Sequence, residues 1–368
     1  MALKAAGPDN GSAPDSRLRA AGRIALAFLV AGAGAATFLF LKLPLPWFLG
    51  PLTFCLAASV LHAPIERPAL LTVPTRIVLG VTIGTAFTPA LLAQIGGMAA
   101  SLSIVVPFTI AIAAAGMLFF ERVVRLDKPT AFFCAVPGGL TDMVVIAQDA
   151  GADTRTVTLV QAARILLLVF LLPFWLQWTT GHRTGGLPPH GTWSIETTLA
   201  DASVLIALGW GGWLLARRLG LAGAALVGPM VLSGLAHVLG LTPARVPIEV
   251  VNFAQITIGI LLGAQFRGLT LNELTSTLAW GAAFAMGLLA ATALLALLAA
   301  RLTGFDATTL LLAYAPGGQT EINLLAYVLG FDVAFTALHH LVRLAVVIFG
   351  VQIVLKLVRR RLRPPDAR

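Results

Sequence analysis

Residues 137–143 read Pro-Gly-Gly-Leu-Thr-Asp-Met and residues 316–322 read Pro-Gly-Gly-Gln-Thr-Glu-Ile, so one short motif occurs twice, 179 positions apart. Both copies lie within long apolar runs. Proline and glycine interrupt a helix and a carboxylate is expensive in hydrocarbon, so a spanning segment rarely carries all three. A duplicated, interrupted and charged segment indicates a site at the centre of a membrane protein built from two repeats.

The composition of the chain is that of an integral membrane protein. Of its 368 residues, 58% are hydrophobic and 11% are charged, against about 25% charged residues in a soluble domain. Apolar runs of about 20 residues, the length of a spanning α-helix, recur along the sequence. The alternation typical of a membrane barrel is absent from it. We therefore expect an all-α polytopic membrane protein with about 10–12 transmembrane elements.

The net charge of +9 comes largely from the two ends of the chain. Basic residues precede the first apolar segment and follow the last one, at residues 17–23 and 356–363. Such residues mark the cytoplasmic side of a membrane protein, so we expect both termini in the cytoplasm and an even number of crossings. The arginines have no aromatic residues interleaved with them, so the lipid bilayer is an expected partner and nucleic acid is not. The sequence leaves the oligomeric state open.

The apolar segments fall into two groups of six around a polar linker. We expect a disordered cytoplasmic tail at 1–21, a first membrane repeat at 22–178, a linker at 179–201, a second repeat at 202–357 and a basic cytoplasmic tail at 358–368. The same offset of 179 relates several further pairs: Gly80 and Gly259, Gly84 and Gly263, Asp127 and Asp306, Gly151 and Gly330, and Arg164 and Arg343. The glycines spaced by four residues predict close helix packing.

The orientation of the two repeats depends on how many elements of each half cross the membrane. Gly-Pro pairs at 50–51 and 228–229 make the second element of each half a candidate re-entrant segment, and five crossings would then invert one repeat relative to the other. Six crossings would make the repeats parallel, which the basic loops favour. Midplane sites built from broken helices recur in inverted transporters, so we favour inversion and keep the parallel arrangement as the alternative.

The twin motifs supply the first group of candidate binding residues. Proline removes a backbone donor, glycine permits unwinding, and the carbonyls and amides so freed must find partners such as protein, water or substrate. A carboxylate at the start of the second half-helix is favoured by the helix dipole. A kinked and capped helix is the simpler alternative. The candidates are Pro137, Gly138, Gly139, Thr141, Asp142, Pro316, Gly317, Gly318, Thr320 and Glu321.

The second group centres on Arg164 and Arg343, each 22 residues after the carboxylate of its repeat. At a rise of about 1.5 Å per residue, each arginine lies at a depth similar to that of the carboxylate across a hairpin, so we expect the two to pair. The pairs are either structural locks or a site where arginine takes an anion and the acid carries a proton or cation. Gln161, His340 and Asn323 add polarity near them, with inter-helix hydrogen bonding as the alternative.

The duplicated motif, the Gly-Pro element before it and the arginine after it resemble the bacterial AbrB-like membrane family, whose members also carry an ammonia monooxygenase label. The likeness covers residues 22–357. Asp142 stands where that family has Glu, and Gln319 replaces a small or apolar residue. The resemblance implies a bacterial inner-membrane protein with a repeated membrane unit. It also carries a second label, that of a regulator of gene expression.

We expect a secondary transporter or permease for a small molecule or ion, with its site at the midplane between two broken helices. A membrane-embedded regulator without transport is the alternative. The six histidines form no readable set of three metal ligands, which argues against an oxygen-activating monooxygenase. We therefore expect no enzyme activity, no metal and no cofactor. No phosphate-binding loop is present in the sequence, so an ion gradient or facilitated diffusion would drive transport.

Overall fold

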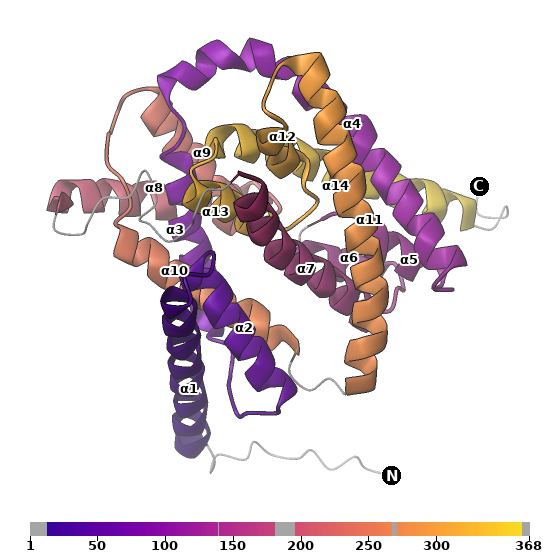
Figure 1. The fold of residues 1–368 in the computed structure, drawn as a ribbon, viewed down its shortest axis with the longest axis horizontal. Coiled ribbons are helices and arrows are strands. Elements are labelled where there is room, and N and C mark those ends of the chain that lie inside the picture. The colour runs from indigo at the N-terminus through magenta and orange to yellow at the C-terminus, as the bar shows by residue number, and fades with distance from the viewer. Residues whose placement is uncertain (1–12, 139, 181–195, 267–270, 363–368) are drawn as a thin grey trace, which may run out of the picture.

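The computed structural model describes residues 13–138, 140–180, 196–266 and 271–362. Within these ranges the description leaves out the side chains of residues 13–17, 90–95, 140–142, 145, 179–180, 271–278 and 355–362. The described residues form helices and connecting turns and contain no strand (Figure 1). The expected all-α fold is confirmed.

The helices that precede residue 180 are repeated in the same order after residue 199. The first half contains α1 (Ala13–Phe40), α2 (Pro46–Val60), a 3-10 turn (Ala69–Leu71), α3 (Thr72–Gly84), α4 (Pro89–Arg122), α5 (Lys128–Ala135), α6 (Leu140–Asp149) and α7 (Thr154–Thr180). The second half contains α8 (Leu199–Arg218), α9 (Ala224–Val238), α10 (Ile248–Gly263), a 3-10 turn (Ala264–Phe266), α11 (Leu271–Thr303), α12 (Ala307–Tyr314), α13 (Gln319–Leu329) and α14 (Val333–Leu362).

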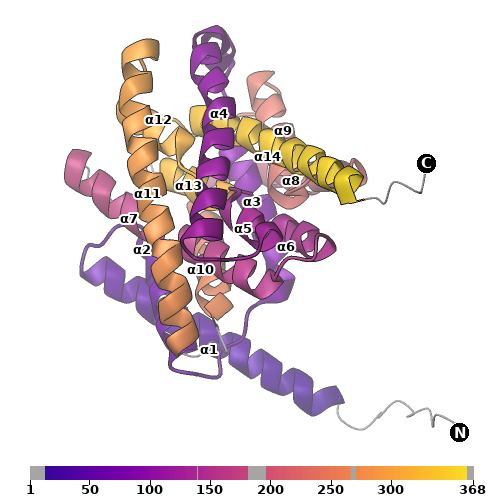
Figure 2. The same ribbon diagram turned by 90° about the vertical axis from the view of Figure 1, so that its right-hand side faces the viewer.

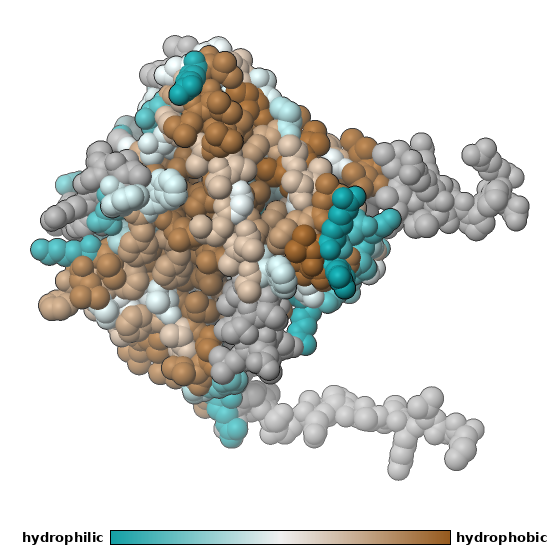
Figure 3. All heavy atoms as spheres, turned by 45° about the vertical axis from the view of Figure 1, so that its right-hand side comes forward, coloured by the Kyte–Doolittle hydropathy of each residue, from teal (hydrophilic) through white to brown (hydrophobic). Residues whose placement is uncertain are grey.

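Among the described helices, 7 are long and apolar enough to cross a membrane, namely parts of α1, α4, α7, α8, α10, α11 and α14. Three shorter apolar segments accompany them: α2, α3 with its preceding turn, and α9. Figure 3 shows hydrophobic residues covering most of one face of the molecule. Large exposed side chains such as Ile110, Leu294 and Phe349 fit contact with lipid.

Local sequence signals place the ends of the short helices in the same way in both halves. Asp127 caps α5 by accepting a hydrogen bond from the Thr130 amide, and Asp306 caps α12 by accepting one from the Thr309 amide. Gly330, which follows α13, has a φ of 74°, a left-handed conformation that glycine adopts without steric cost. These breaks keep α5, α6, α12 and α13 too short to span the bilayer.

The helices with two glycines pack against the opposite half of the chain. A Cβ atom added at Gly80 of α3 would lie 2.5 Å from the Leu226 carbonyl oxygen of α9. A Cβ atom added at Gly259 of α10 would lie 2.8 Å from the Phe48 carbonyl oxygen of α2. The expected close packing is therefore present, and it joins the two halves rather than neighbouring helices of one half.

The second element of each half is a continuous helix. Pro51 lies inside α2 and Pro229 lies inside α9 without ending either helix. The glycine before each proline brings that backbone against the preceding helix, because a Cβ atom at Gly50 would lie 2.5 Å from the Gly34 carbonyl oxygen. The Gly-Pro pair therefore permits close helix contact and does not break either helix; the re-entrant second element stays a prediction.

The fifth element of each half is the one that enters and leaves on the same side. The Asp153 amide, which follows α6, donates to the Thr130 hydroxyl at the beginning of α5 over 2.9 Å. The end of α6 has thus returned to the level where α5 began. We call this α5–α6 segment the first hairpin.

The second half repeats this arrangement. Phe305, just before α12, packs its ring against that of Phe335 at the start of α14, with ring centroids 4.9 Å apart. We call α12–α13 the second hairpin, and its end likewise returns to the level of its beginning. Neither hairpin crosses the molecule.

Without the hairpins, five helices of each half remain in the described chain: α1, α2, α3, α4 and α7, and α8, α9, α10, α11 and α14. The inverted arrangement requires all five of each half to cross, including the shorter α2, α3 and α9. An odd number of crossings reverses the direction of the second half. Contacts along α2 and α10 show that these two helices run in the same direction, and the same holds for α3 and α9. This path agrees with the inverted arrangement; the origin of the two halves by duplication stays a prediction.

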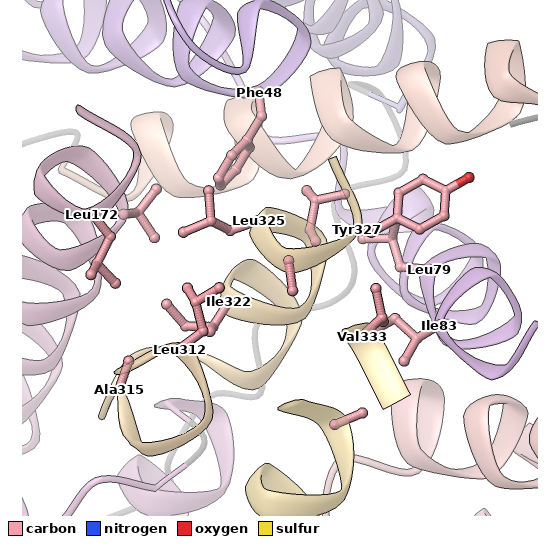
Figure 4. Close-up of a cluster of buried hydrophobic side chains, with 14 of the residues drawn as sticks. Phe48, Leu79, Ile83, Leu172, Leu312, Ala315, Ile322, Leu325, Tyr327 and Val333 are labelled. Carbon is pink, nitrogen blue, oxygen red and sulfur yellow. The ribbon is translucent and has the colours of Figure 1, made fainter. Parts of the chain in front are cut away.

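Helix α13 of the second hairpin lies in the interior, between helices from both halves. Figure 4 shows Ile322 and Leu325 of α13 among Leu312 of α12, Leu172 of α7 and Phe48 of α2. On the other flank, Tyr327 lies beside α3 (Figure 4), and Figure 2 also places α13 inside the bundle. The second hairpin is therefore packed into protein and is not exposed to lipid.

Candidate functional site

The tip of each hairpin is a short unwound stretch at a buried proline. Pro137 and Pro316 are both buried. A Cβ atom at Gly138 would lie 2.5 Å from Cγ of Met143, and one at Gly317 would lie 2.8 Å from Cγ1 of Ile322. The first glycine of each motif thus packs against the residue five positions later, which closes the turn. Two matched buried turns leave backbone carbonyls at each tip that need hydrogen-bond donors.

Arg164 of α7 provides donors for the first tip. Its guanidinium donates to the Val136 carbonyl and to the Gln161 side chain, both over 3.4 Å. Gln161 in turn donates to the Phe133 carbonyl over 2.8 Å. Arg164 is 1% exposed and Gln161 is 0% exposed. The two polar side chains therefore brace the end of α5 from the neighbouring helix.

Arg343 of α14 does the same for the second tip with more bonds. Its guanidinium donates to the carbonyls of Ala315 and Gly317, the latter over 3.0 Å. It also lies 3.5 Å from Nδ1 of His340, whose Nε2 lies 3.1 Å from the Leu312 carbonyl. A neutral His340 protonated on Nε2 satisfies both contacts, because it then donates to the carbonyl and accepts from the arginine.

The expected pair between Glu321 and Arg343 is not present. The Glu321 carboxylate folds back over the start of α13, where a Cβ atom at Gly318 would lie 1.9 Å from Oε2. Arg343 is engaged by carbonyls because the proline break leaves them without partners in an apolar interior, and a planar guanidinium can serve two at once.

The corresponding first-half pair stays a prediction. Gly139 and the side chains of Thr141 and Asp142 lie outside the described residues. A surface ion pair joins Arg23 and Glu66, 3.9 Å apart and far from the hairpins in sequence. Structural locks made of carboxylate and arginine are thus absent from the described part of the second hairpin.

The two arginines belong to opposite halves, Arg164 to α7 and Arg343 to α14. The position that a Cβ would take on Gly317 lies 4.0 Å from Cδ1 of Leu168, which is one turn beyond Arg164 on α7. The second tip is therefore adjacent to the helix that braces the first. This neighbourhood contains both arginines and the second hairpin tip, and we call it the central site.

Several polar atoms around the central site have no partner among the described residues. They are Nε of Arg164, Nε2 of Gln319, and both amide atoms of Asn323. Asn323 is 0% exposed, and Thr320, between Gln319 and Asn323, is 9% exposed. Buried polar groups are nearly always hydrogen-bonded, so unpaired ones mark the place of a water, an ion or a ligand.

A buried polar network beside the second hairpin was not predicted. Nε2 of His339 lies 2.9 Å from the Ser101 hydroxyl of α4, and the Tyr314 hydroxyl donates to the Ser101 carbonyl over 3.0 Å. Ser101 and Tyr314 lie in apolar helices of opposite halves, 213 residues apart, so the sequence gives no signal that joins them. The network ties α4 of the first half to α12 and α14 of the second.

The base of the first hairpin holds a charged turn outside the spanning segments. The Asp153 carboxylate accepts a hydrogen bond from the Thr156 hydroxyl over 2.6 Å and others from the amides of Arg155 and Thr156. The hydroxyl of Thr156, more than any other group, holds the pKa of Asp153 below its ordinary value. Asp153 thus caps α7 as an ionised side chain.

Most predicted site residues are brought together at the two tips and on the two bracing helices. Thr320 and Asn323 lie on α13, beyond the second tip, and Glu321 turns back to its start. Within the described chain, no three His, Cys, Asp or Glu side chains are grouped as metal ligands. Gln319 was noted in the sequence only as a departure from the family pattern, and that departure was the available signal for it.

Comparison with known proteins assigns most of the chain to a family. Residues 47–359 match the family described as Transition state regulatory protein AbrB. Over 286 residues the chain is 28% identical to the Uncharacterized protein YhjN of Bacillus subtilis (strain 168), an alignment that covers 74% of each chain. Both hairpins and both arginines fall inside the range that matches the family.

Proposed function

The chain belongs to the AbrB family, and we propose that it is a secondary transporter or permease that carries a small solute through the central site. The family resemblance seen in the sequence motifs is confirmed, and the seven long apolar helices fit a multi-pass membrane protein. The printed family description names a regulator and assigns no transport. The proposal therefore depends on the geometry of the hairpins.

The observation that carries the proposal is the pair of broken, non-crossing hairpins whose tips are braced by two neighbouring buried arginines. Unwound backbone at membrane depth is tolerated only where protein buries it or a cavity is lined by it. Sites of this kind in secondary transporters lie between repeats near the bilayer midplane, and one repeat rocks against the other around them. The cross-packing of α3 with α9 and of α2 with α10 joins helices of both halves into one scaffold, against which the hairpins would move.

In this proposal the substrate meets the hairpin tips, and an ion gradient or facilitated diffusion drives its movement. Asp142 and Glu321 are the acids available to carry a coupling proton or cation. The protein is neither an enzyme nor a nucleic-acid binder, and it lies in the bacterial inner membrane with both termini in the cytoplasm. The basic residues at both ends support this orientation.

A membrane-embedded regulator without transport is the second candidate, and the family description favours it. A regulator needs a surface through which it signals to a partner. The buried side-chain polar atoms that lack a partner in the described chain belong to Arg164, Gln319 and Asn323, around the central site. A buried site of this kind is explained by a bound solute better than by a docked partner.

The test is solute-induced current or uptake in proteoliposomes, measured for single small anions, cations and neutral solutes. At least one solute should enter liposomes that contain the wild-type protein. We expect Arg343→Lys to reduce that flux about tenfold or more, because lysine cannot bridge two carbonyls, while the surface control Arg218→Gln retains it. Flux of none of the solutes would overturn transport. Unchanged flux and pH dependence in Asp142→Asn with Glu321→Gln would remove the coupling role of the acids.

A further inference from the structure

The central site carries more positive charge than its described neighbours neutralise. Arg164 and Arg343 are 1% and 6% exposed, and their described hydrogen-bond partners are neutral carbonyls and side chains. Gly317, whose carbonyl accepts from Arg343, packs against Leu168 on the helix that carries Arg164, so the two charges share one apolar neighbourhood. Two like charges in a medium of low dielectric repel strongly, so a mobile negative charge placed near both would stabilise them.

The unpaired buried atoms point to the same chemistry. Nε of Arg164 can act only as a hydrogen-bond donor, and the side-chain amides of Gln319 and Asn323 carry further N–H donors. Both the oxygen and the nitrogen of the Asn323 side chain lack a hydrogen-bond partner, so flipping the amide group does not give either atom a partner. An oxyanion is an acceptor at each of its oxygens and can receive several such donors, whereas a cation cannot.

The acid at the start of α13 lies away from these amides. Gln319 and Asn323 are four residues apart and so share one face of the helix, whereas Glu321, two residues from each, is turned by about 200°. Its carboxylate is folded back over Gly318 at the start of the helix. Glu321 therefore does not neutralise the face that carries the two amides.

The first hairpin lacks these amides. At the offset of 179, Leu140 corresponds to Gln319 and Val144 corresponds to Asn323. Helix structure by itself favours an apolar residue at a buried position without partners, because an unpaired amide there is costly. The two amides of α13 are thus a local addition to a scaffold that folds without them in the other half.

We infer that the central site binds a small oxyanion, such as a carboxylate or an inorganic phosphate or sulfate, with Arg164, Gln319 and Asn323 as donors and Arg343 as the second positive charge. This inference rests on the proposed function and names its substrate class. The two arginines attract the anion, and the amide face of α13 selects among anions by the number and spacing of their oxygens.

The experiment measures thermal unfolding of the full chain in zwitterionic detergent at constant ionic strength. The probes are sodium acetate, succinate, citrate, phosphate and sulfate, with chloride as the reference salt and acetamide and succinamide as neutral isosteres. At least one oxyanion should raise the unfolding temperature by several degrees, and its neutral isostere should not. Carboxylate probes and inorganic probes separate the two possible sources of the same chemistry.

Two variants make the result specific to the site. Asn323→Leu should unfold at a higher temperature than the wild type without ligand and should lose most of the anion-induced shift. Gln255→Leu removes a buried amide that does have a partner, Asn252, and should keep the anion-induced shift. An anion shift retained by Asn323→Leu would overturn the role of α13, and equal shifts with acetate and acetamide would overturn the anion class.

Failure of this inference differs from failure of transport. If proteoliposomes take up a cation or a neutral solute and no oxyanion shifts the unfolding temperature, transport stands and the anion class is wrong. If oxyanions bind with the expected loss in Asn323→Leu but no solute is taken up, the site stands and the transport proposal fails. No oxyanion shift and no flux would reject both.

Discussion

The two hairpins share one scaffold and differ in the chemistry of their surroundings. In both, a capped half-helix ends at a buried Pro-Gly turn, and an arginine from the last helix of the same half donates to the freed carbonyls. Around the first hairpin, Phe119, Phe120 and Phe284 pack their rings together. Around the second, Ser101, His339 and Tyr314 form hydrogen bonds.

Features shared by both hairpins are those that a hairpin needs in order to fold, whereas features found in one hairpin serve something other than folding. A proline break and an arginine brace occur in both halves, so they belong to the scaffold. The amides of Gln319 and Asn323 and the network around His339 occur in one, and Asn323 is left unpaired at a cost in stability. Residues that lower the stability of the fold and form no structural contact in exchange are typical of binding sites.

The largest expected effect comes from removing the arginines. Arg343→Gln should lower the free energy of unfolding by about 2–4 kcal/mol, because two buried carbonyls lose a charged donor, and Arg164→Gln by about half as much, because it loses one. Chemical unfolding in mixed micelles measures both values. An equal or larger loss for Arg164→Gln would show that the second hairpin is not the more strongly braced of the two.

Position 323 of the second hairpin is equivalent to position 144 of the first, and exchanging their residues should change the free energy of unfolding in opposite directions. Asn323→Leu should raise the free energy of unfolding by about 1–2 kcal/mol because it removes unpaired buried polar atoms. Val144→Asn should lower it by a smaller amount, because Val144 is only partly buried and packs against the apolar cluster of the first hairpin. The same unfolding measurement compares the two variants. Destabilisation by Asn323→Leu would mean that Asn323 has a partner in the folded protein and is not kept for a ligand.

The polar network of the second half should contribute less. Tyr314→Phe removes the hydrogen bond to the Ser101 carbonyl and should cost about 0.6 kcal/mol, the average for side-chain hydrogen bonds between membrane helices. Hydrogen exchange at the contact of α4 with α12 provides a local measure. The first hairpin has Ala135 at the equivalent position and so has no such hydrogen bond. If Tyr314→Phe leaves the exchange rates unchanged, the hydrogen bond does not make the second hairpin more stable than the first.

The smallest effect concerns acid sensitivity at the base of the first hairpin. The pKa of Asp153 is lower in the folded protein, so its stabilisation is fully present above the ordinary pKa of aspartate, about 3.9, and is lost as the pH falls towards the folded-state value. Thr156→Val should bring that pKa back towards normal and flatten the loss. Hydrogen exchange at the start of α7 between about pH 6 and pH 3 tests this window. An unchanged profile would show that Thr156 is not the dominant cause.

Sequence reasoning located the two motifs, the arginines and the polar residues beside them, because each breaks the rules of an apolar span. It assigned the wrong partner to Arg343, since depth along a hairpin places a carboxylate and an arginine at one level without showing which group faces the guanidinium. It also took the Gly-Pro pairs as candidate helix breaks, whereas both helices continue through them. Proline alone does not distinguish a helix packed through Gly50 from a chain that turns back at Pro137.

The sequence by itself determined a helical membrane protein with two equivalent sets of segments, since hydropathy over about 20 residues and the Pro-Gly-Gly breaks are local properties. The tertiary structure alone decided which helices of opposite halves touch, that the fifth elements turn back, and that the arginines brace carbonyls near each other. Those outcomes depend on contacts between residues far apart in the chain. In an apolar interior, each freed carbonyl takes whichever donor the packing of neighbouring helices brings to it.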